Sequence, residues 1–546
     1  MTSIFKSKNT ATKQKLRGGY YTPKKIAHYL SDWSLRNNNE RIIEPSCGDG
    51  NFIESALEVA DAKGLEIDLL AVEIDTEEYK KAQIRNGHRN ITWVNEDFFR
   101  AYGELKSNDE KFDVVLGNPP FIRFQYFDDE SRDIAFGHLR DVGYKPTKLA
   151  NSWAAFVQLS IELLNDGGRL GMVIPAELLQ VKYATELRER IVKHFDHVIL
   201  VTFKKLVFPD IQQEVVLLLA EGKHSKEGNI CDVHTIEVHD ESDLDTEILE
   251  KVIKHAEAKH TRAGMKWTSF FLPEKCFGVL DYWQKNSKLT SLGDLASVDV
   301  GIVTGRNKFF VLDDEILHKY NLKDYCTPMV GRTSAINRSS FNNDLFKKAK
   351  EKYPSYLLDL KNIDEKDFST GLKEYISLGE QEGVNTGYKC RVRKRWYEVP
   401  SIYISDGFLF RQIHKYPLLV SNDAKVACTD TIHRVRLLKD VNMQQLCAAF
   451  INSLTFAWSE VCGRSYGGGV LELETKESEE LPIPFFEDVV LDVEKIEQLL
   501  SENNIDAVLE YVDGKLLIEK MGMSKEDVQS LRESWVILRD RRINRK

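Results

Sequence analysis

The stretch at residues 41–52, RIIEPSCGDGNF, runs from a short apolar segment of β type into a glycine-containing loop that opens a helix. Doubly wound α/β folds bind a cofactor at such a turn, between the first strand and the first helix. Glycine turns between strand and helix are also common without any ligand. The segments that follow along the chain decide between a structural turn and a cofactor loop.

Short apolar runs of strand length alternate with segments of helical periodicity from Arg41 to about Glu221. This alternation predicts a sheet with crossover helices. One such helix is predicted at Ala150–Leu164, where apolar residues recur at three- and four-residue spacing. We expect a doubly wound sheet of seven strands, which are Arg41–Glu44, Leu69–Glu73, Thr92–Val94, Phe112–Leu116, Arg169–Ile174, His197–Thr202 and Glu214–Ala220.

The length of 546 residues and the hydrophobic content of 42% predict two to four domains rather than a single core. Charged residues dominate after Glu221, and the following half has mixed strand, turn and helix signals. The predicted parts are an α/β domain at 1–240, a connection at 241–290, a mixed α+β domain at 291–486 and a charged helical tail at 487–546.

The charge is unevenly distributed along the chain. A net charge of −10 argues against a protein that coats polyanions indiscriminately, but local charge decides nucleic-acid binding. Residues 1–25 carry seven cations and no acid, and residues 389–397, KCRVRKRWY, interleave cations with aromatic rings. Such runs form either a solvated face or a phosphate contact. The candidates for DNA contact are Arg391, Arg393, Lys394 and Arg395.

The eight cysteines are scattered, without a Cys-x-x-Cys pair or a Cys/His cluster at zinc spacing, so no metal is expected. The longest apolar runs, such as Val215–Ala220, have the length of a strand, and no signal peptide is apparent. We therefore expect a soluble, cytoplasmic protein with free thiols.

The first glycine loop carries acids where a phosphate-binding loop would be electropositive. Glu44 and Asp49 flank it, which disfavours a pyrophosphate and favours a cation. S-adenosyl-L-methionine carries a sulfonium and an ammonium and no phosphate. The loop candidates for binding it are Glu44, Pro45, Ser46 and Gly48.

Further acids follow the next two strands. Glu73, about 25 residues beyond Gly48 and followed by Ile74, suits the two ribose hydroxyls of such a cofactor. Asp97 suits its adenine amino group, and Phe98 its adenine ring. The alternatives are helix caps for the two acids and a core position for Phe98. Their order at the carboxyl ends of successive strands favours a cofactor site.

Residues 118–121 read Asn-Pro-Pro-Phe, directly after a predicted strand. An exocyclic amine on a heteroaromatic ring is a poor nucleophile, because its lone pair is delocalised into the ring. Hydrogen bonds from its two N–H groups to the Asn118 side-chain carbonyl and the Pro119 main-chain carbonyl would favour a pyramidal nitrogen. Pro119 and Pro120 restrict the backbone and offer no N–H, and Phe121 offers a face for a planar base. The alternative is a proline turn that ends a strand.

The order of these motifs resembles the DNA N6-adenine methyltransferases of bacterial restriction-modification systems in the gamma arrangement. A Tyr21-Thr22-Pro23 segment precedes the glycine loop, the acids follow, and a large second region comes after the Asn-Pro-Pro-Phe loop. The resemblance implies that the Tyr-Thr-Pro segment packs over the methionine part of S-adenosyl-L-methionine; its alternative is a simple helix start. It also implies that 1–240 is the methyltransferase domain and 291–486 the target-recognition domain.

Other features of the family are matched more loosely. Phe121 falls within the family pattern of Asn-Pro-Pro followed by Tyr or Phe, although it lacks the phenolic hydroxyl. The segment 206–209 resembles a family loop whose aromatic contacts the other side of the extruded adenine, which makes Phe208 a base-contact candidate or a core residue. The cofactor loop departs from the Phe-x-Gly-x-Gly form of some classes. Weaker landmarks are Leu292–Leu295, Gly305–Asn307, Gly467–Val470 and Leu481–Pro484.

The resemblance implies a sequence-specific enzyme that methylates a flipped-out adenine in duplex DNA and protects host DNA from a separate endonuclease. We expect a monomer. The alternatives are a protein-glutamine or RNA methyltransferase, a non-catalytic DNA-recognition subunit, and a fusion with a nuclease. About 17 residues precede the Tyr-Thr-Pro region, so an N-terminal nuclease domain is not expected. The sequence does not name the recognised bases.

Overall fold

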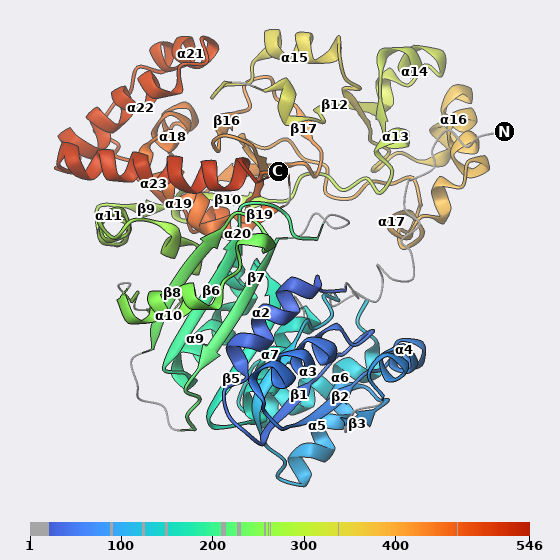
Figure 1. Ribbon diagram of the computed structural model, residues 1–546. Helices are drawn as coiled ribbons and strands as arrows, with labels where there is room; N and C mark the ends of the chain where they lie inside the picture. The colour runs from blue at the N-terminus through green and yellow to red at the C-terminus, as the bar shows by residue number, and fades with distance from the viewer. Residues whose placement is uncertain are drawn as a thin grey trace. The chain divides into compact units, whose positions relative to one another are not determined.

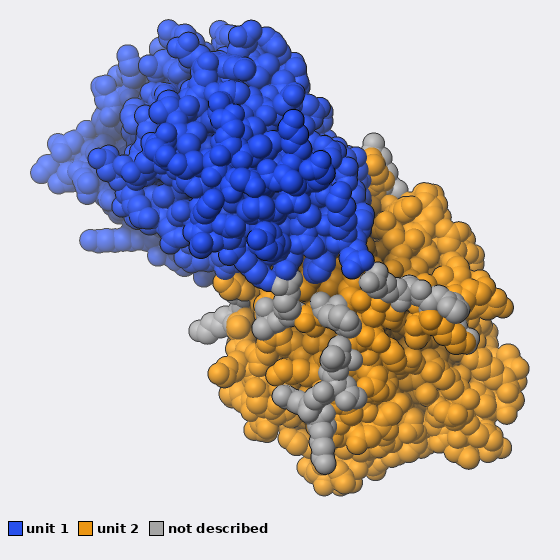
Figure 2. All heavy atoms as spheres, turned by 90° about the vertical axis from the view of Figure 1, so that its left-hand side faces the viewer, with its two compact units in different colours: residues 1–9, 272–465, 469–543 blue, residues 10–271, 466–468, 544–546 orange. Residues whose placement is uncertain are grey.

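The computed structural model describes residues 21–87, 91–122, 126–147, 151–208, 214–225, 231–255, 258–259, 261, 264–336, 338–466 and 468–545. Most of the basic N-terminal stretch, Pro209 and Gly467 lie outside these residues. The chain forms two compact units, coloured separately in Figure 2. The first unit in chain order, orange in Figure 2, is Thr10–Phe271 with Tyr466–Gly468 and Asn544–Lys546. The second unit, blue in Figure 2, is Leu272–Ser465 with Gly469–Ile543.

The first unit is built on an eight-stranded sheet with the order β3-β2-β1-β4-β5-β7-β6-β8 (Figure 1). Among the described pairings, β7 is antiparallel to both its neighbours and the others are parallel. The expected strands are present as β1 Glu40–Glu44, β2 Ile67–Val72, β3 Ile91–Val94, β4 Phe112–Gly117, β5 Leu164–Pro175, β6 His197–Phe203 and β7 Val215–Glu221. The doubly wound α/β sheet predicted from the sequence is thus confirmed, with eight strands in place of the expected seven.

The eighth strand, β8 Asp232–Val238, was not expected. It pairs in parallel with β6 and ends the order of the sheet. Charged and polar residues alternate with apolar ones in this strand, so composition alone made the region after Glu221 resemble a loop. The first unit also continues beyond residue 240, because it includes the helix α10, Thr246–His255.

Helices cover both faces of this sheet, as the doubly wound prediction requires (Figure 1). Ile42 of β1 belongs to a buried cluster with α2 and α3, whereas its neighbour Ile43 belongs to a second cluster with α5, α6, α7 and α9. Successive strand residues point to opposite faces, so one strand supplies both cores. The helices are α2 Lys24–Ser34, α3 Asn51–Lys63, α4 Thr76–Asn86, α5 Phe98–Ser107, α6 Asp129–Asp141, α7 Ser152–Glu162, α8 Glu177–Gln180 and α9 Thr185–His194.

The strand order reverses beside β1, which lies between β2 and β4. In parallel sheets the ligand binds outside the carboxyl ends of the strands at such a switch point. The glycine loop follows β1 and the Asn-Pro-Pro-Phe loop follows β4. The topology therefore brings together the two loops that the sequence singled out.

The second unit contains several small sheets instead of one large sheet. Their orders are β10-β18-β14-β16, β11-β13-β12-β17, β15-β20-β19 and β21-β9. The strands are β9 Thr290–Ser291, β10 Ala296–Asp299, β11 Val311–Leu312, β12 Cys326–Val330, β13 Tyr356–Leu358, β14 Gly407–Phe410, β15 Gln412–Ile413, β16 Leu419–Ser421, β17 Ala427–Cys428, β18 Ile432–Leu437, β19 Arg464–Tyr466, β20 Val470–Glu472 and β21 Pro482–Ile483.

Helices connect these sheets and fill the rest of the unit. They are α11 Glu274–Gln284, α12 Leu292–Leu295, α13 Asn307–Phe310, α14 Asp314–Lys319, α15 Asn343–Lys350, α16 Thr370–Gln381, α17 Tyr388–Arg391, α18 Met443–Phe450, α19 Ser453–Cys462 and α20 Thr475–Glu479. The mixed α+β character expected after residue 290 is present.

The last helices are α21 Val493–Ser501, α22 Ile505–Asp513, a π-helical turn at Gly514–Lys520, and α23 Lys525–Ile543. They were expected to form a charged tail, but α23 packs against α11 and α19. The Trp535 ring lies 5.2 Å from the Phe456 ring and is buried. The high content of charged residues in this segment prevented us from predicting that part of it is buried.

No helix in the described part of the chain has the length and apolar character needed to cross a membrane.

Candidate active site

The loop after β1 is shaped by two glycines in the left-handed region. Gly48 has φ +53° and Gly50 has φ +89°. A Cβ on Gly50 would lie 2.8 Å from the Asn86 side-chain nitrogen, so α4 approaches closely there. A Cβ on Gly48 would meet no atom within 4 Å, which leaves that side of the loop open to a ligand. The loop is tied to β2 by the bond from the Cys47 N–H to the Val72 carbonyl, 2.9 Å.

Glu73 braces this loop from the end of β2. Its carboxylate oxygens accept from the Gly48 N–H and the Asp75 N–H, each at 2.8 Å. The cap of α4 is instead Asp75, which accepts from two amides of the first turn. Each Glu73 oxygen has a further lone pair, so these bonds are compatible with ribose hydroxyls as additional donors. Burial raises the pKa of Glu73.

Glu44 is a buried carboxyl group whose surroundings disfavour its charged form. Its side chain is 3% exposed, and its Oε2 atom has no hydrogen-bond partner among the described residues. Burial, reinforced by Glu73 and Asp49, raises the pKa of Glu44 well above its ordinary value. A buried carboxylate is costly unless a cation or donors compensate it. The loop therefore suits a cationic ligand better than a phosphate.

Asp97 and Phe98 have structural roles at the start of α5. Asp97 caps the helix by accepting from the Phe99 N–H at 2.8 Å. Phe98 is 2% exposed and stacks on Phe156, with ring centroids 4.9 Å apart. Both positions match the alternatives weighed for them, and their contacts with a cofactor stay predictions. Ile74 differs, because 63% of it is exposed beside Glu73, which is an apolar surface suited to a planar ring.

The Tyr-Thr-Pro segment meets both loops through Thr22. The buried Thr22 hydroxyl accepts from the Asn118 side-chain nitrogen at 3.1 Å, and its carbonyl accepts from the Asn51 side chain at 3.2 Å. The Ser46 hydroxyl donates to the Asn118 carbonyl at 3.4 Å. Three segments far apart in the sequence thus converge on one point. Pro23 starts α2, since its carbonyl accepts from two amides of the first turn.

The bond to Thr22 also orients the Asn118 amide. Its nitrogen faces Thr22, so its side-chain oxygen is directed to the other side. Tyr21, at the start of the same segment, is exposed, and its hydroxyl donates to Glu78 at 2.9 Å. Burial and Glu78 raise the pKa of this phenol, so it stays protonated at neutral pH.

Ser152 holds the proline part of the Asn-Pro-Pro-Phe loop, a contact that the sequence did not indicate. Its hydroxyl donates to the Pro120 carbonyl and accepts from the Ile122 N–H at 3.0 Å. A serine at the start of a helix resembles a cap, so no local signal marks this contact. Pro119 is buried, and Pro120 is half-buried beside it.

The two rings proposed to hold a base differ in exposure. Phe121 is half-buried and packs against the clusters on both faces of the sheet. Phe208 is buried in the cluster that includes α2 and α3. The surroundings of Phe208 are therefore those of a core residue, which was the alternative to a base contact. A contact of Phe208 with a base stays a prediction.

The basic run at 389–397 is only partly available to a ligand. Arg393 donates to the Thr304 carbonyl at 2.7 Å, and burial lowers its pKa. Arg395 donates to the Ile363 carbonyl at 2.9 Å and pairs with Glu398. Arg391 and Lys394 are exposed. Charge alone predicted four equal phosphate contacts, but two of these cations bind their own chain.

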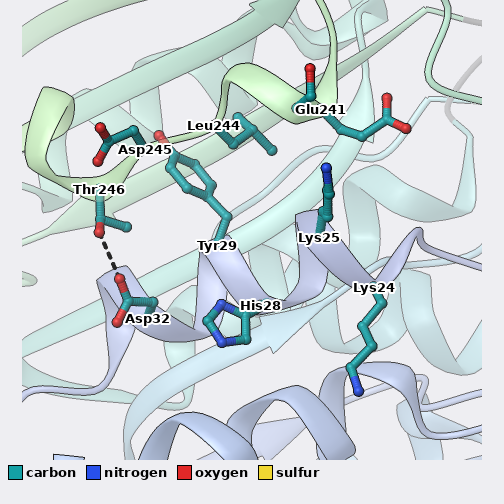
Figure 3. Close-up of a pocket in the computed structure, with 10 residues that line it drawn as sticks. Lys24, Lys25, His28, Tyr29, Asp32, Glu241, Leu244, Asp245 and Thr246 are labelled. Atoms are coloured by element: carbon teal, nitrogen blue, oxygen red, sulfur yellow. Dashed lines mark hydrogen bonds between the residues drawn. The ribbon is translucent and has the colours of Figure 1, made fainter. Parts of the chain in front are cut away.

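A separate pocket of about 520 Å³ lies outside these loops (Figure 3). It lies between α2 and the segment 241–246, and Thr246 donates to Asp32 at 2.6 Å on its wall. Its lining combines Lys24, Lys25 and His28 with acids and includes none of the candidate site residues. Among the described residues no group of three or more His, Cys, Asp or Glu is arranged to hold a metal ion.

The strand order, the acid-lined loop after β1 and the Asn-Pro-Pro-Phe loop after β4 define an α/β methyltransferase. Residues 4–269 match the family model N-6 DNA Methylase. Residues 264–517 match the C-terminal domain of the type II methyltransferase M.Eco57I. The two models together match residues 4–517, and with the relatives below they support the DNA N6-adenine methyltransferase of a type II restriction-modification system that the motifs led us to expect.

Relatives match over most of the chain. Type II methyltransferase M.AccI of Acinetobacter calcoaceticus is 22% identical over 549 aligned positions, 94% of each protein. Type II methyltransferase M.XamI of Xanthomonas campestris pv. amaranthicola is 22% identical over 487, 86% of each. The solved complex of the type IIL restriction-modification enzyme MmeI with DNA covers 96% of this chain and 72% of its own, at 12% identity and a TM-score of 0.55. That likeness concerns the fold.

Proposed function

We propose that this protein transfers a methyl group from S-adenosyl-L-methionine to the N6 atom of an adenine extruded from a specific site in duplex DNA. The observation that carries the proposal is the Asn118 amide, held by Thr22 beside the loop of the buried Glu44. Within the family we assign the gamma arrangement, because the cofactor motifs precede the Asn-Pro-Pro-Phe loop and the large second unit follows it.

The residues around the glycine loop fit this cofactor. Glu44 supplies the negative charge for its cationic part, Glu73 the acceptors for the ribose hydroxyls, and Ile74 an exposed apolar surface for the adenine. When bound, S-adenosyl-L-methionine supplies a methyl group activated by its sulfonium. Asp97, Phe98, Pro45, Ser46 and the segment Tyr21–Pro23 complete the proposed cofactor site.

The catalytic loop prepares the amine. The Asn118 side-chain oxygen and the Pro119 carbonyl accept from the two N–H groups of the target adenine, which favours a pyramidal nitrogen with an available lone pair. Thr22 keeps the amide in the required orientation, and Ser152 holds the Pro120 carbonyl. Phe121 and Phe208 hold the ring. No covalent intermediate is needed, and burial raises the pKa of the Cys47 thiol, which makes it a poor nucleophile.

The DNA is proposed to be bound by the second unit. Residues 291–486 are assigned to target recognition, 241–290 to the connection and 487–546 to a helical support of the second unit. The amino group of adenine is engaged in base pairing, so extrusion costs a few kcal/mol that DNA contacts must repay. We assign a monomer that acts beside a separate endonuclease and protects host DNA from it.

One rival keeps the chemistry and changes the substrate to RNA or a protein glutamine. DNA as the substrate is supported by the match of residues 264–517 to the C-terminal domain of a type II methyltransferase. The test incubates the full chain with methyl-labelled cofactor and, in parallel, duplex DNA, RNA and a protein mixture. Label in DNA supports the proposal, whereas label only in RNA or protein contradicts it.

Two further rivals are a non-catalytic recognition subunit and a nuclease fusion. Absence of methyl transfer despite DNA binding would favour the first. Incubation of the protein with plasmid and Mg²⁺ tests the second, because cleavage would overturn the assignment as a methyltransferase alone.

A further inference from the structure

Exposed apolar side chains in the second unit gather on a few connected loops. Gathered apolar residues on a surface indicate a binding site, whereas scattered ones are ordinary. Tyr388 and Val392 lie on and directly after α17, and Arg393 links this segment to the Val303 carbonyl, while Arg434 links the loops of Val300 and Ser401. The large exposed apolar residues among the described part of this unit are Tyr282, Val300, Val303, Tyr388, Val392, Ile404, Leu438 and Val490.

Two arginines fix these loops from within. Arg393 donates to the carbonyls of Val303 and Thr304 at 3.1 and 2.7 Å. Arg434 donates to the carbonyls of Val300 and Ser401 at 3.0 and 2.6 Å. A Cβ on Gly305 would lie 2.8 Å from the Lys389 Cβ, so the loop at 303–308 packs directly on α17. The surface is therefore preorganised before any partner binds.

The outward side chains of this surface are cationic and apolar. We define the α17 surface as Tyr388, Lys389, Arg391, Val392 and Lys394, with the loop 303–308 packed against α17, the helix labelled in Figure 1. Residues 387–395 contain no acid, and the loop 303–308 contains none either. The three outward cations stand out in a chain with net charge −10.

These side chains suit a phosphate backbone better than a pattern of bases. Lysines act as point charges toward phosphates, and the ring and the branched side chain can pack on the sugars without reading any base. The segment 387–395 contains no Asn, Gln, Asp or Glu, the side chains that pair with adenine or cytosine edges, so the only base edge that its Lys and Arg side chains could pair with is that of guanine.

We infer that the α17 surface holds duplex DNA independently of its base sequence, with Lys389, Arg391 and Lys394 at phosphates and Tyr388 and Val392 against the sugars between them. This inference rests on the proposed function. It assigns to the surface the positioning of the duplex, and it leaves the reading of the target to other residues of the second unit.

The first test measures DNA affinity of the full chain at several salt concentrations. The variant K389Q/R391Q/K394Q is compared with K347Q/K348Q/K352Q, which removes three exposed cations on and beside α15. Each lost phosphate contact lowers the slope of log affinity against log salt by about 0.9. For the α17 variant, we expect the magnitude of this slope to fall by about two to three, equally on DNA with and without the target. For the α15 control, we expect the slope to stay unchanged.

The second test separates the apolar contact from charge. Tyr388→Ala is compared with Tyr282→Ala, because the two side chains are 68% and 67% exposed. Tyr388→Ala is expected to weaken binding about fivefold with an unchanged salt slope, since burial of the ring against sugars is an apolar and not an ionic contact. Tyr282→Ala is expected to leave both quantities unchanged.

The inference would be overturned if the α17 variant kept the DNA affinity and the salt slope of the wild type. If the wild-type protein methylates DNA in the same experiments, the proposed function stays intact. Loss of binding confined to target DNA would also overturn it, because the surface would then read bases. If the wild-type protein neither binds nor methylates duplex DNA, the proposed function fails and the inference with it.

Discussion

At the residue scale, Asn118 has the most specific role in the proposed chemistry. Asn118→Ala removes the side-chain acceptor but leaves both prolines in place. We expect the methyl-transfer rate to fall by about 10²–10³-fold, the usual effect of losing one group that polarises the reacting atoms. Single-turnover methylation measures the rate. An unchanged rate with intact DNA binding would show that the amide does not activate the amine.

Thr22 tests whether the orientation of that amide matters. Thr22→Val removes the hydroxyl that accepts from Asn118 and keeps the shape of the side chain, whereas Thr22→Ser keeps the hydroxyl. We expect Val to lower the transfer rate by up to about tenfold, because one hydrogen bond that orients Asn118 is worth about 0.5–1.5 kcal/mol. Ser should restore most of it. Equal rates in the two variants would exclude this positioning role.

Glu44 links cofactor binding to stability. Removal of a charge-assisted contact costs about 1.5–3 kcal/mol, so Glu44→Gln should weaken S-adenosyl-L-methionine binding by roughly 10- to 100-fold. Calorimetric titration measures this change. An unchanged affinity would exclude Glu44 from the cofactor site.

The same substitution has an opposite effect on the cofactor-free fold. Folding raises the pKa of Glu44, so its proton is held more tightly in the folded than in the unfolded chain. The stability that this proton provides is complete below the ordinary glutamate pKa and is lost as pH rises through the folded value. Glu44→Gln should therefore be more stable than the wild type at neutral pH, by an amount that shrinks on acidification. Denaturant unfolding at pH 4 to 8 measures the difference, and a constant difference contradicts it.

The residue types in the sequence predicted which residues meet at the site, but they did not predict how exposed each side chain is. Glu44, Glu73 and Asn118 could be grouped because parallel strands bring their carboxyl ends together. Ser152 could not, since its contact with the Pro120 carbonyl depends on how α7 packs. Arg393 has the same charge as Arg391, but only the packing of the 303–304 loop reveals that its donors are already engaged.

At the element scale, α23 is the part that composition described least well. Arg542 pairs in a bidentate manner with Glu460 of α19, at 2.7 and 3.0 Å, and both side chains are buried. The bond between them fixes a helix that is rich in charged residues onto the core of the second unit. Helical periodicity predicted the helix, but the partner of Arg542 lies 82 residues away in the sequence.

Arg542→Ala should therefore destabilise the protein by about 3–5 kcal/mol, because it leaves the Glu460 carboxylate buried without its cation. The matched control is Lys515→Ala, which breaks an exposed pair with Glu519 and should cost less than about 0.5 kcal/mol. Denaturant unfolding followed by tryptophan fluorescence measures both. Equal losses in the two variants would contradict the structural role of the buried pair.

The strand β8 shows a second limit at this scale. Seven strands could be predicted because their apolar runs are flanked by helices and turns. β8 has a polar residue at about every second position, as an edge strand does, and only its pairing with β6 distinguishes it from a loop.

At the scale of the whole molecule, the chain combines two units with different cores. The order of motifs predicted the α/β character of the first and the mixed character of the second. It did not predict that the first unit extends to Phe271, because charged helices such as α10 resemble linkers in composition. The proposed division of labour places methyl transfer in the first unit and target recognition in the second.

The most direct test of this account is to methylate a mixed-sequence duplex with the full chain and map the modified bases, with Asn118→Ala in parallel. We expect N6-methyladenine at a fixed adenine within one recurring sequence, and none with the variant under single-turnover conditions in which the wild type completes the reaction. Methyl groups on cytosine, methyl groups without a recurring sequence, or equal modification by the variant would contradict it.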